Sequence, residues 1–325
     1  MAAMQIAFVK CQGSGNDFPL IDARALDITD SEWAGIARAL ADRDGPVGGD
    51  GLLALVKGDD THDFGMRMWN TDGSEAETCL NGLRCTARLG FEALGIDTAR
   101  VKLKTSSADV AREPDLTPGV ATVRTKVGPA STRLGDIGLK LDAAEWIDAP
   151  IPGMPSARAF TAVAMPNPHL VAFVDRVDEA ELVALGQWTE AGPALIPGRA
   201  NISFVELRGG DLYVRTFERG VGLTDSCGSA MAGSTFAAAL TGRTGFGREI
   251  RVFNKGGLVR ASATSPADGA EVTIKGNASF LYDATIEVDP VAARAATPVV
   301  HARREEEARA WSAAVAALTA ADAVN

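Results

Sequence analysis

Two segments of this chain follow one plan, and they constrain its fold more than any other feature. Residues 70–85 read NTDGSEAETCLNGLRC, and residues 218–229 read ERGVGLTDSCGS. In each segment a polar turn that contains glycine ends at a cysteine, Cys79 or Cys227, where an apolar helical stretch begins. Of these two cysteines, one lies in each half of the 325-residue chain, which predicts a duplicated architecture.

Both helical stretches are apolar over much of their surface. The first carries apolar residues at intervals of four, four and three, which places them on one helical face: Leu83, Ala87, Phe91 and Leu94. The second, residues 231–240, is rich in alanine. Strand-like runs punctuated by Gly, Asp, Asn and Pro fill most of the remaining sequence. Each helix is therefore predicted to lie inside a wrapping sheet. Surface helices are predicted over 30–41 and 178–188.

The composition excludes several classes of function. With 32 Lys and Arg against 42 Asp and Glu, the formal charge is −10, so no basic field exists for nucleic acid or an anionic membrane. No apolar run approaches the ~18 residues of a membrane span, and the start lacks a signal-peptide pattern. Four cysteines are too few for a disulfide scaffold. We therefore expect a cytoplasmic protein in which Cys11 and Cys85 are core thiols.

The two helix starts predict acid–base chemistry by thiols. A cysteine at a helix N-terminus faces free N–H groups and the positive end of the helix dipole, which favour the thiolate. The same N–H groups can hold a carboxylate. Inverting an α-carbon needs a base on one face and an acid on the other, and two opposed cysteines supply both. Such a reaction needs no pyridoxal phosphate, metal or other cofactor, and we predict none.

Five motifs carry a resemblance to one enzyme family. They are GSGNDF at 13–18, DGLL at 50–53, the Cys79 segment at 70–85, MPNPH at 165–169 and the Cys227 segment at 218–229. Their order is that of diaminopimelate epimerases, and the resemblance spans about residues 5–290. The family it resembles comprises cofactor-independent, two-cysteine epimerases that interconvert LL- and meso-diaminopimelate for lysine and cell-wall synthesis. The resemblance thus implies a small-molecule amino-acid substrate and a possible homodimer.

The resemblance also implies a fold and its domains. The expected class is α/β (α+β), with two pseudo-symmetric domains, each a curved, mostly antiparallel sheet wrapped around a central helix. Residues 1–130 form the domain of Cys79, with a return segment at about 278–290, and residues 131–277 form the domain of Cys227. The active cleft is expected between them. Residues 291–325 are expected to form an extension that is helical or partly disordered.

The resemblance assigns roles to individual residues. Cys79 and Cys227 resemble the catalytic pair, which His169 and Glu218 support. The reacting carboxylate is assigned to helix-start donors, namely Asn81, Gly82, Gly228 and Ser229. Asn16 resembles a contact near the reacting amino group. The distal end of the substrate is assigned to a polar group, namely Asn70, Asn167, Asn201, Glu218 and Arg219. Arg219 can clamp a carboxylate with two bonds.

Four positions depart from the family pattern: Gly51, Leu80, Leu223 and Ala230. Leu80 stands where glycine is usual and loses glycine's tolerance for positive φ. These departures leave open a related cofactor-independent racemase with another side-chain specificity, for example for histidine. A non-catalytic amino-acid-binding protein of the same fold is the alternative from another class. It predicts no exchange at the α-carbon.

Overall fold

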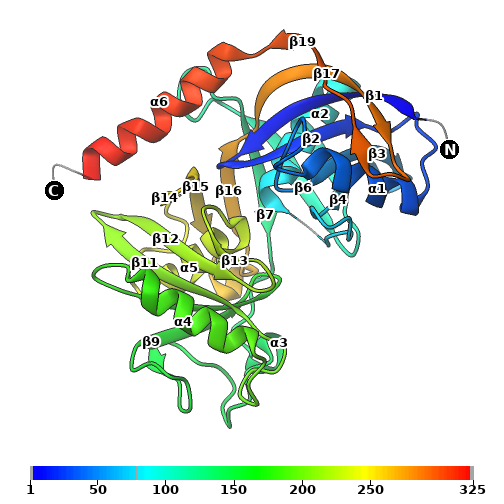
Figure 1. Cartoon of the computed structure of the whole chain (residues 1–325). Coiled ribbons are helices and arrows are strands. Elements are labelled where there is room, and N and C mark those ends of the chain that lie inside the picture. Colours follow the sequence, from blue (N-terminus) through cyan, green and yellow to red (C-terminus); the bar gives the residue numbers. More distant parts are fainter. Residues whose placement is uncertain (1–2, 78, 323–325) are drawn as a thin grey trace. The chain divides into compact units, whose positions relative to one another are not determined.

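The computed structural model describes residues 3–77 and 79–322. The chain divides into two compact units, one formed by Met1–Thr125 with Lys275–Asn325 and the other by Lys126–Ile274. Both units combine antiparallel and parallel strand pairs with a few helices (Figure 1). The predicted α/β class is confirmed.

The first unit is one long sheet with helices on both faces. Its strands are β1 (Met4–Gly13), β2 (Asn16–Asp22), β3 (Leu52–Asp59), β4 (His62–Trp69), β5 (Thr98–Lys102), β6 (Ser107–Glu113), β7 (Thr122–Val127), β17 (Ser279–Asp289), β18 (Arg294–Ala295) and β19 (Val299–Arg303). Its helices are α1 (Asp30–Ala41), α2 (Leu80–Leu94) and α6 (Glu305–Asp322). The strands pair in the order β17, β1, β2, β3, β4, β5, β6, β7, with parallel pairing only at β2–β3 and β4–β5.

Helix α2 lies against the inner face of this sheet and contacts each strand from β1 to β6. The outer face packs on α1, because Leu52 and Ala54 of β3 join the core cluster of Trp33 and Ile36. The intervening Leu53 points the other way, since side chains alternate along a strand, and it meets α2 at Gly82. Helix α1 coincides with the predicted helix 30–41, and a capping box starts it: Thr29 and Glu32 bond each other's backbone N–H.

The second unit repeats this plan. Its strands are β8 (Ala149–Pro150), β9 (Ala159–Ala164), β10 (Pro168–Phe173), β11 (Asn201–Arg208), β12 (Asp211–Glu218), β13 (Gly222–Thr224), β14 (Ile250–Asn254) and β15 (Gly257–Ala263), and β16 (Val272–Asn277) leads back to the first unit. Its helices are α3 (Leu134–Ile137), α4 (Glu179–Glu190), α5 (Gly228–Leu240) and the 3-10 turn η1 (Pro266–Asp268). Helix α4 matches the helix predicted over 178–188 and runs two residues further.

Helix α5 contacts β9, β10, β11, β12, β14 and β15, so strands surround it as they surround α2. Helix α4 covers the other face of β11 and β12 (Figure 1). Ile202 and Phe204 of β11 pack with Leu182 and Leu185 of α4, whereas the alternate residue Ser203 is buried on the α5 side. The predicted wrapping of both apolar helices by strands is confirmed.

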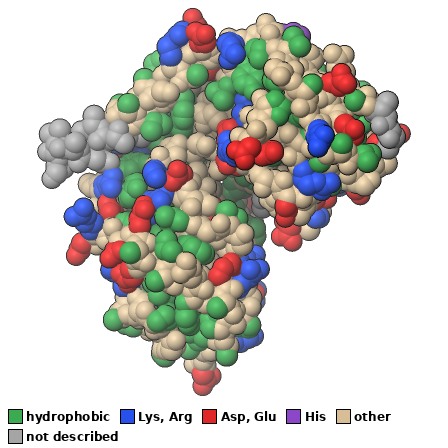
Figure 2. Space-filling model, in the orientation of Figure 1, with side chains coloured by type: hydrophobic (Ala, Val, Ile, Leu, Met, Phe, Trp, Pro, Cys, Tyr) green, Lys and Arg blue, Asp and Glu red, His purple; other side chains and the backbone are tan. Residues whose placement is uncertain are grey.

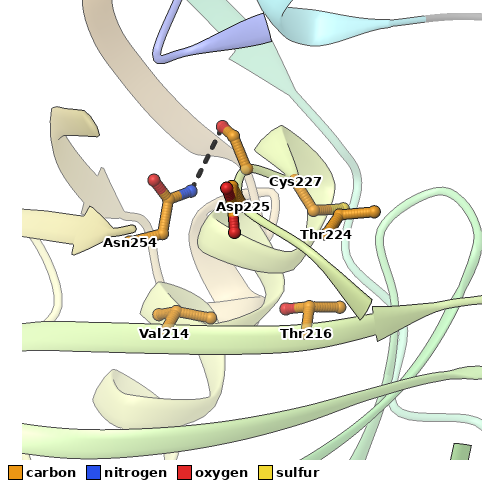
Figure 3. A pocket seen from close by; sticks show the side chains of 7 residues that line it. Val214, Thr216, Thr224, Asp225, Cys227 and Asn254 are labelled. Carbon is orange, nitrogen blue, oxygen red and sulfur yellow. Dashed lines mark hydrogen bonds between the residues drawn. The ribbon is translucent and has the colours of Figure 1, made fainter. Parts of the chain in front are cut away.

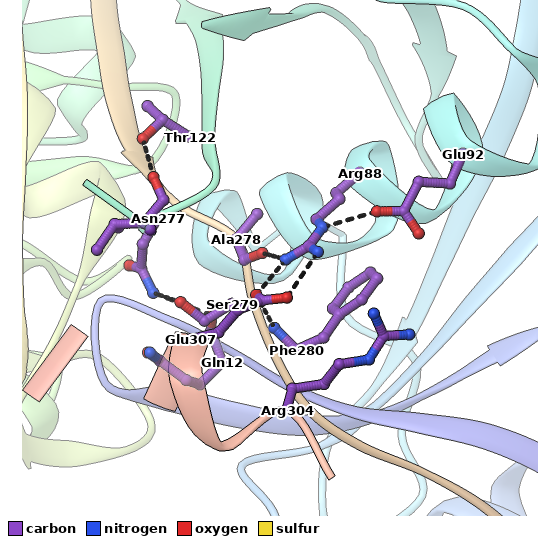
Figure 4. Close-up of polar contacts among 12 residues, drawn as sticks. Gln12, Arg88, Glu92, Thr122, Asn277, Ala278, Ser279, Phe280, Arg304 and Glu307 are labelled. Atoms are coloured by element: carbon purple, nitrogen blue, oxygen red, sulfur yellow. Dashed lines mark hydrogen bonds and ion pairs between the residues drawn. The ribbon is translucent and has the colours of Figure 1, made fainter. Parts of the chain in front are cut away.

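Strand pairing and ion pairs hold the C-terminal segment to the rest of the first unit. Strand β19, which the sequence analysis did not predict, pairs antiparallel with β17. Beyond it, Glu307 of α6 accepts two bonds from Arg88 of α2, at 2.5 and 2.9 Å, and one from the N–H of Phe280 (Figure 4). Arg304 pairs with Asp283 at 3.0 Å. The extension is thus attached to the helix that begins at Cys79.

Charged side chains are spread over the surface. On the face drawn in Figure 2, Lys and Arg stand among Asp and Glu, and the described residues gather no broad basic patch there. Across residues 3–77 and 79–322, no helix is both long and apolar enough to span a membrane.

Candidate active site

Cys79 occupies the N-cap of α2. The turn before it is closed by bonds between Asn70 and Ser74, and the Asp72 carboxylate accepts the N–H of Ser74 at 2.8 Å. Cys79 has extended backbone angles (φ −145°, ψ 110°), and its Sγ accepts the N–H of Gly82 at 3.4 Å. Among the four cysteines, Cys79 alone is not buried. This thiol therefore lies in a helix N-cap and is accessible.

Cys227 occupies the equivalent N-cap of α5, with φ −136° and ψ 109°. Its Sγ lies 3.5 Å from Oγ of Ser229, and it lines a small pocket together with Thr216, Asp225 and Asn254 (Figure 3). Only 7% of the residue is exposed. Burial raises the pKa of the Cys227 thiol well above its ordinary value, and the nearby Glu218 carboxylate raises it further.

In the first unit, the predicted contacts Asn16 and Asn81 bond each other. Nδ2 of Asn81 donates to Oδ1 of Asn16 at 2.6 Å, and Nδ2 of Asn16 donates to the Asp50 carboxylate at 3.0 Å. Gly13 permits this close approach of the β1–β2 turn, because a Cβ there would lie 2.6 Å from the carbonyl oxygen of Asn81. Buried Arg84 donates to the other end of the Asn81 amide at 2.8 Å. Arg84 lies within the NGLRC motif, although no role was predicted for it.

The second unit gathers Asn167, His169, Asn201 and Arg219. Nε2 of His169 lies 2.9 Å from the amide oxygen of Asn167, which can only accept, so Nε2 carries the proton. The amide nitrogen of Asn201 lies 3.4 Å from Nε2 and 3.5 Å from Nδ1, and it can donate only to Nδ1 because Nε2 is protonated. Oδ1 of Asn201 accepts the backbone N–H of Arg219 at 2.8 Å. Burial, with a smaller effect of the Arg219 charge, lowers the pKa of His169 to about 3, so this histidine is neutral at neutral pH.

The predicted distal-end residues also differ in exposure. Arg219 is exposed and donates one bond, from Nη1 to the carbonyl of Gly198 at 3.1 Å. Glu218 accepts a 2.5 Å bond from the hydroxyl of Thr224. Asn70 lies in the first unit, on the exposed turn before Cys79. The predicted site residues therefore divide between the units, with Asn16, Asn70, Cys79, Asn81 and Gly82 in the first and Asn167, His169, Asn201, Glu218, Arg219, Cys227, Gly228 and Ser229 in the second.

The departures from the family pattern have structural explanations in two cases. Leu80 is the first residue of α2 and does not belong to the residues of positive φ, so the leucine causes no backbone strain there. Gly51 has no room for a side chain, because a Cβ would lie 2.4 Å from the carbonyl oxygen of Trp69. Leu223 pairs with Phe217 and packs on the α4 core, and Ala230 is fully buried in α5.

Within the described ranges, no group of three or more His, Cys, Asp or Glu side chains is arranged to hold a metal ion. The start of α2 presents the Asn81 amide and the Gly82 N–H, and such groups bind carboxylates.

Comparison with known proteins identifies the family. A family model described as diaminopimelate epimerase matches residues 8–131 and 161–281. The diaminopimelate epimerase of Clostridium acetobutylicum is 36% identical over 290 residues, which cover 88% of this chain and 87% of that protein. The enzyme of Lactiplantibacillus plantarum is 35% identical over 301 residues, covering 88% and 91%.

Solved structures share the fold at low identity. A phenazine biosynthesis protein of the PhzF family from Bacillus anthracis superposes with a TM-score of 0.62 at 14% identity, covering 88% of this chain and 99% of that one. A hydroxyproline epimerase from Agrobacterium vitis gives a TM-score of 0.62 at 12% identity, covering 96% and 98%. The matching family and the curated relatives are epimerases, so the chain is an isomerase. The chain belongs to the diaminopimelate epimerase family.

Proposed function

We propose that this enzyme interconverts LL- and meso-diaminopimelate with Cys79 and Cys227 as its acid–base pair. The observation that carries the proposal is the matched placement of the two cysteines. Each is the N-cap of the strand-wrapped helix of its own unit, and the φ angles differ by only 9° (−145° and −136°). Membership of the family supports the substrate.

The reaction is a proton exchange at the α-carbon. One cysteine, as thiolate, takes the α-proton, so that an S–H bond forms as the C–H bond breaks. The other cysteine, as thiol, delivers its proton to the opposite face of the carbanion. Helix-start N–H groups at Asn81 and Gly82 and at Gly228 and Ser229 hold the carboxylate and stabilise the negative charge that develops on it.

The distal end of diaminopimelate offers a second carboxylate and a second amine. Exposed Arg219 supplies a planar guanidinium for the carboxylate. The Glu218 carboxylate is suited to an ammonium group, and Asn167 and Asn201 have side chains that both donate and accept. The network through His169 holds these two asparagines in place, which supports a specificity for this end of the substrate.

Two further features belong to the proposal. Catalysis by free thiols requires a reducing environment, which supports a cytoplasmic enzyme. A homodimer is proposed from the resemblance to the family.

Deuterium incorporation tests the proposal. The reduced protein is incubated in deuterated water with LL-diaminopimelate, meso-diaminopimelate and a panel of amino acids that includes histidine. We expect deuterium at the α-carbon of diaminopimelate alone. Incorporation should fall by at least about a thousandfold in Cys79→Ala and in Cys227→Ala, since each removes one of the two proton-transfer groups.

Cys85→Ala is the matched control, because Cys85 is a fully buried thiol of the same helix and does not lie at its start. It should keep nearly wild-type exchange. Exchange with histidine only would establish the racemase alternative. Binding of diaminopimelate without any exchange would establish the non-catalytic alternative.

A further inference from the structure

Arg84 is a fully buried cation without an acidic partner in the described structure. Its side chain is 0% exposed. The guanidinium donates to neutral oxygens only, namely those of Leu80 (3.4 Å), Asn81 (2.8 Å), Ser14 (2.8 Å) and Asn277 (3.1 Å). No Asp or Glu of the described ranges forms an ion pair with it. Burying a charge costs free energy unless an opposite charge compensates it. An anion beside Arg84 would therefore stabilise the protein.

The charges in the same region already compensate one another. Lys10 is buried and pairs with Asp17 at 2.5 Å. Arg43 pairs with Asp17 and with Asp50, each at 2.6 Å. These two cations and two anions sum to zero, which leaves the positive charge of Arg84 uncompensated.

The next arginine of the same helix shows that α2 can place carboxylates beside a buried guanidinium. Arg88, one turn further along, pairs with Glu92 at 2.9 Å and with Glu307 at 2.5 Å. The absence of such partners is therefore particular to Arg84 and does not follow from its position on a wrapped helix.

Through its bonds to Leu80 and Asn81, Arg84 lies at the start of α2, where the thiols of Cys85 and, with a smaller effect, Cys79 act on its charge. Cys85 is fully buried, whereas Cys79 is accessible and already accepts the N–H of Gly82. Cys79 is thus the one of these two thiols that solvent and substrate can reach. At the second helix start, the residue five positions after Cys227 is the buried Ala232, and the charged neighbour of Cys227 is the Glu218 carboxylate.

Arg84 also sets the orientation of an amide at the helix start. A guanidinium only donates, so the amide oxygen of Asn81 must face it. The amide nitrogen of Asn81 then points to Asn16, which in turn donates to Asp50. The result is a chain of hydrogen bonds with one direction, from the buried cation to a carboxylate at the surface.

We propose that Arg84 is a positioning residue of the reaction: it makes Cys79 the thiolate of the substrate-free enzyme and fixes the amide orientation of Asn81. Its missing anions are the Cys79 thiolate and, on binding, the substrate carboxylate. Cys227, buried beside the Glu218 carboxylate, is then the protonated thiol. This inference rests on the proposed function, which it deepens by assigning the resting protonation of each cysteine.

Alkylation by iodoacetamide tests the inference without substrate. In the wild-type enzyme, Cys79 should react as a thiolate below about pH 8, under the ordinary cysteine pKa of about 8.5, and Cys227 should react far more slowly. Peptide mass spectrometry assigns each rate to its cysteine. A pH profile of Cys79 at or above the ordinary value would overturn the inference, and this measurement needs no variant.

The variants separate charge from geometry. Arg84→Met should slow alkylation of Cys79 at pH 7 by at least about tenfold and move its pH profile upward, since an adjacent opposite charge shifts a pKa by one or more units. Arg84→Lys keeps the charge, so its rate of Cys79 alkylation at pH 7 should stay within about threefold of the wild-type rate. It should raise KM, because an ammonium cannot hold Asn81 and Ser14 as a planar fork does. In the control variant Arg88→Met, the rate of Cys79 alkylation should stay within about twofold of the wild-type rate.

The outcomes distinguish the inference from the proposed function. If both Arg84 variants lose thermal stability while the Cys79 pH profile stays unchanged, Arg84 is only structural and the inference is wrong, although exchange at the α-carbon can still be present. If the profile moves as expected but the wild-type enzyme exchanges no α-proton of diaminopimelate, the proposed function fails and the charge assignment stands.

Discussion

The two helix starts of this enzyme share their backbone and differ in their charges. Cys79 and Cys227 both have extended angles at an N-cap, within 10° of each other in φ and within 1° in ψ. At the start of α2, buried Arg84 bonds to Leu80 and Asn81 and has no carboxylate partner in the described structure. Beside Cys227 lies the Glu218 carboxylate, and the thiol is buried. The two helix starts thus share one backbone geometry and differ in the charged groups near them.

Two helix starts of the same backbone geometry can therefore serve a reaction that needs two different protonation states. A proton exchange at one carbon requires one thiolate and one thiol at the same time. Two identical environments would favour equal protonation of both cysteines. Opposite neighbouring charges remove that degeneracy, and they do so without changing the helix dipole or the N–H groups that bind a carboxylate.

The largest effect is expected on the pH dependence of the free energy of unfolding, through the neutral His169 of the second unit. Because the pKa of His169 is lowered to about 3, chiefly by burial and then by the Arg219 charge, the unfolded chain binds a proton that the folded state rejects. Stability is fully present above about pH 6.5 and falls as pH drops toward 3, by up to ~1.4 kcal/mol per pH unit. Urea unfolding at pH 7, 6 and 5 measures this.

His169→Gln should flatten that dependence, and His301→Gln, at an exposed position, should leave it as in the wild type. An unchanged slope in His169→Gln would show that other groups cause the acid sensitivity and that the second unit holds no neutral buried histidine of this importance.

A smaller effect is expected at the ion pair that holds α6 to the first unit. Burial raises the pKa of Glu307, but the bonds and charge of Arg88, the N–H of Phe280 and the charge of Arg304 together lower it more, so the net pKa lies below the ordinary value. The stabilisation is therefore present at neutral pH and is lost as pH falls through the acidic range. Glu307→Gln should cost about 1–2 kcal/mol at pH 7, measured by chemical unfolding.

The control is Glu305→Gln, because Glu305 is exposed and pairs only with Arg309 in the described structure; its effect should stay under about 0.5 kcal/mol. At pH 3.5 the difference between the wild type and Glu307→Gln should shrink. A difference that persists unchanged in acid would contradict the ionic origin of the attachment.

The smallest expected effect sharpens the comparison of the thiols directly. Glu218→Gln removes the charge beside Cys227 and keeps an acceptor for Thr224. The pKa of Cys227 should fall but stay above the ordinary value, because burial is the larger cause. Alkylation of Cys227 at pH 8 should rise about tenfold, and that of Cys79 should not change. Equal acceleration at both thiols would mean a general loosening of the fold.

Much of this architecture could be predicted from the sequence because the signals were local. The period of Leu83, Ala87 and Phe91 predicted a helix with a broad apolar face, and the structure shows α2 wrapped by strands. The N-cap placement of both cysteines followed from a polar turn before an apolar run. The helix over 30–41 carries a capping box in its sequence: Thr29 is the N-cap, and Glu32 follows three residues later.

Other features depend on contacts between distant residues, which a pattern along the chain cannot report. Strand β19 is a short exposed run that becomes a strand only because it pairs with β17. The requirement for glycine at Gly51 arises from the carbonyl of Trp69. The unusual surroundings of Arg84 could not be predicted, because the sequence does not show which groups lie around a buried arginine. In the fold its partners include Ser14 and Asn277, which are neutral and distant in sequence.

The roles of the individual site residues stay predictions, and the central one is that two thiols act on opposite faces of one carbon. The most direct measurement follows the early course of the reaction of LL-diaminopimelate in deuterated water by mass spectrometry of each separated epimer. We predict deuterium at the α-carbon of the newly formed meso epimer, while the recovered LL epimer still carries hydrogen. Equal deuteration of both epimers from the first time points would indicate a single base and contradict the account.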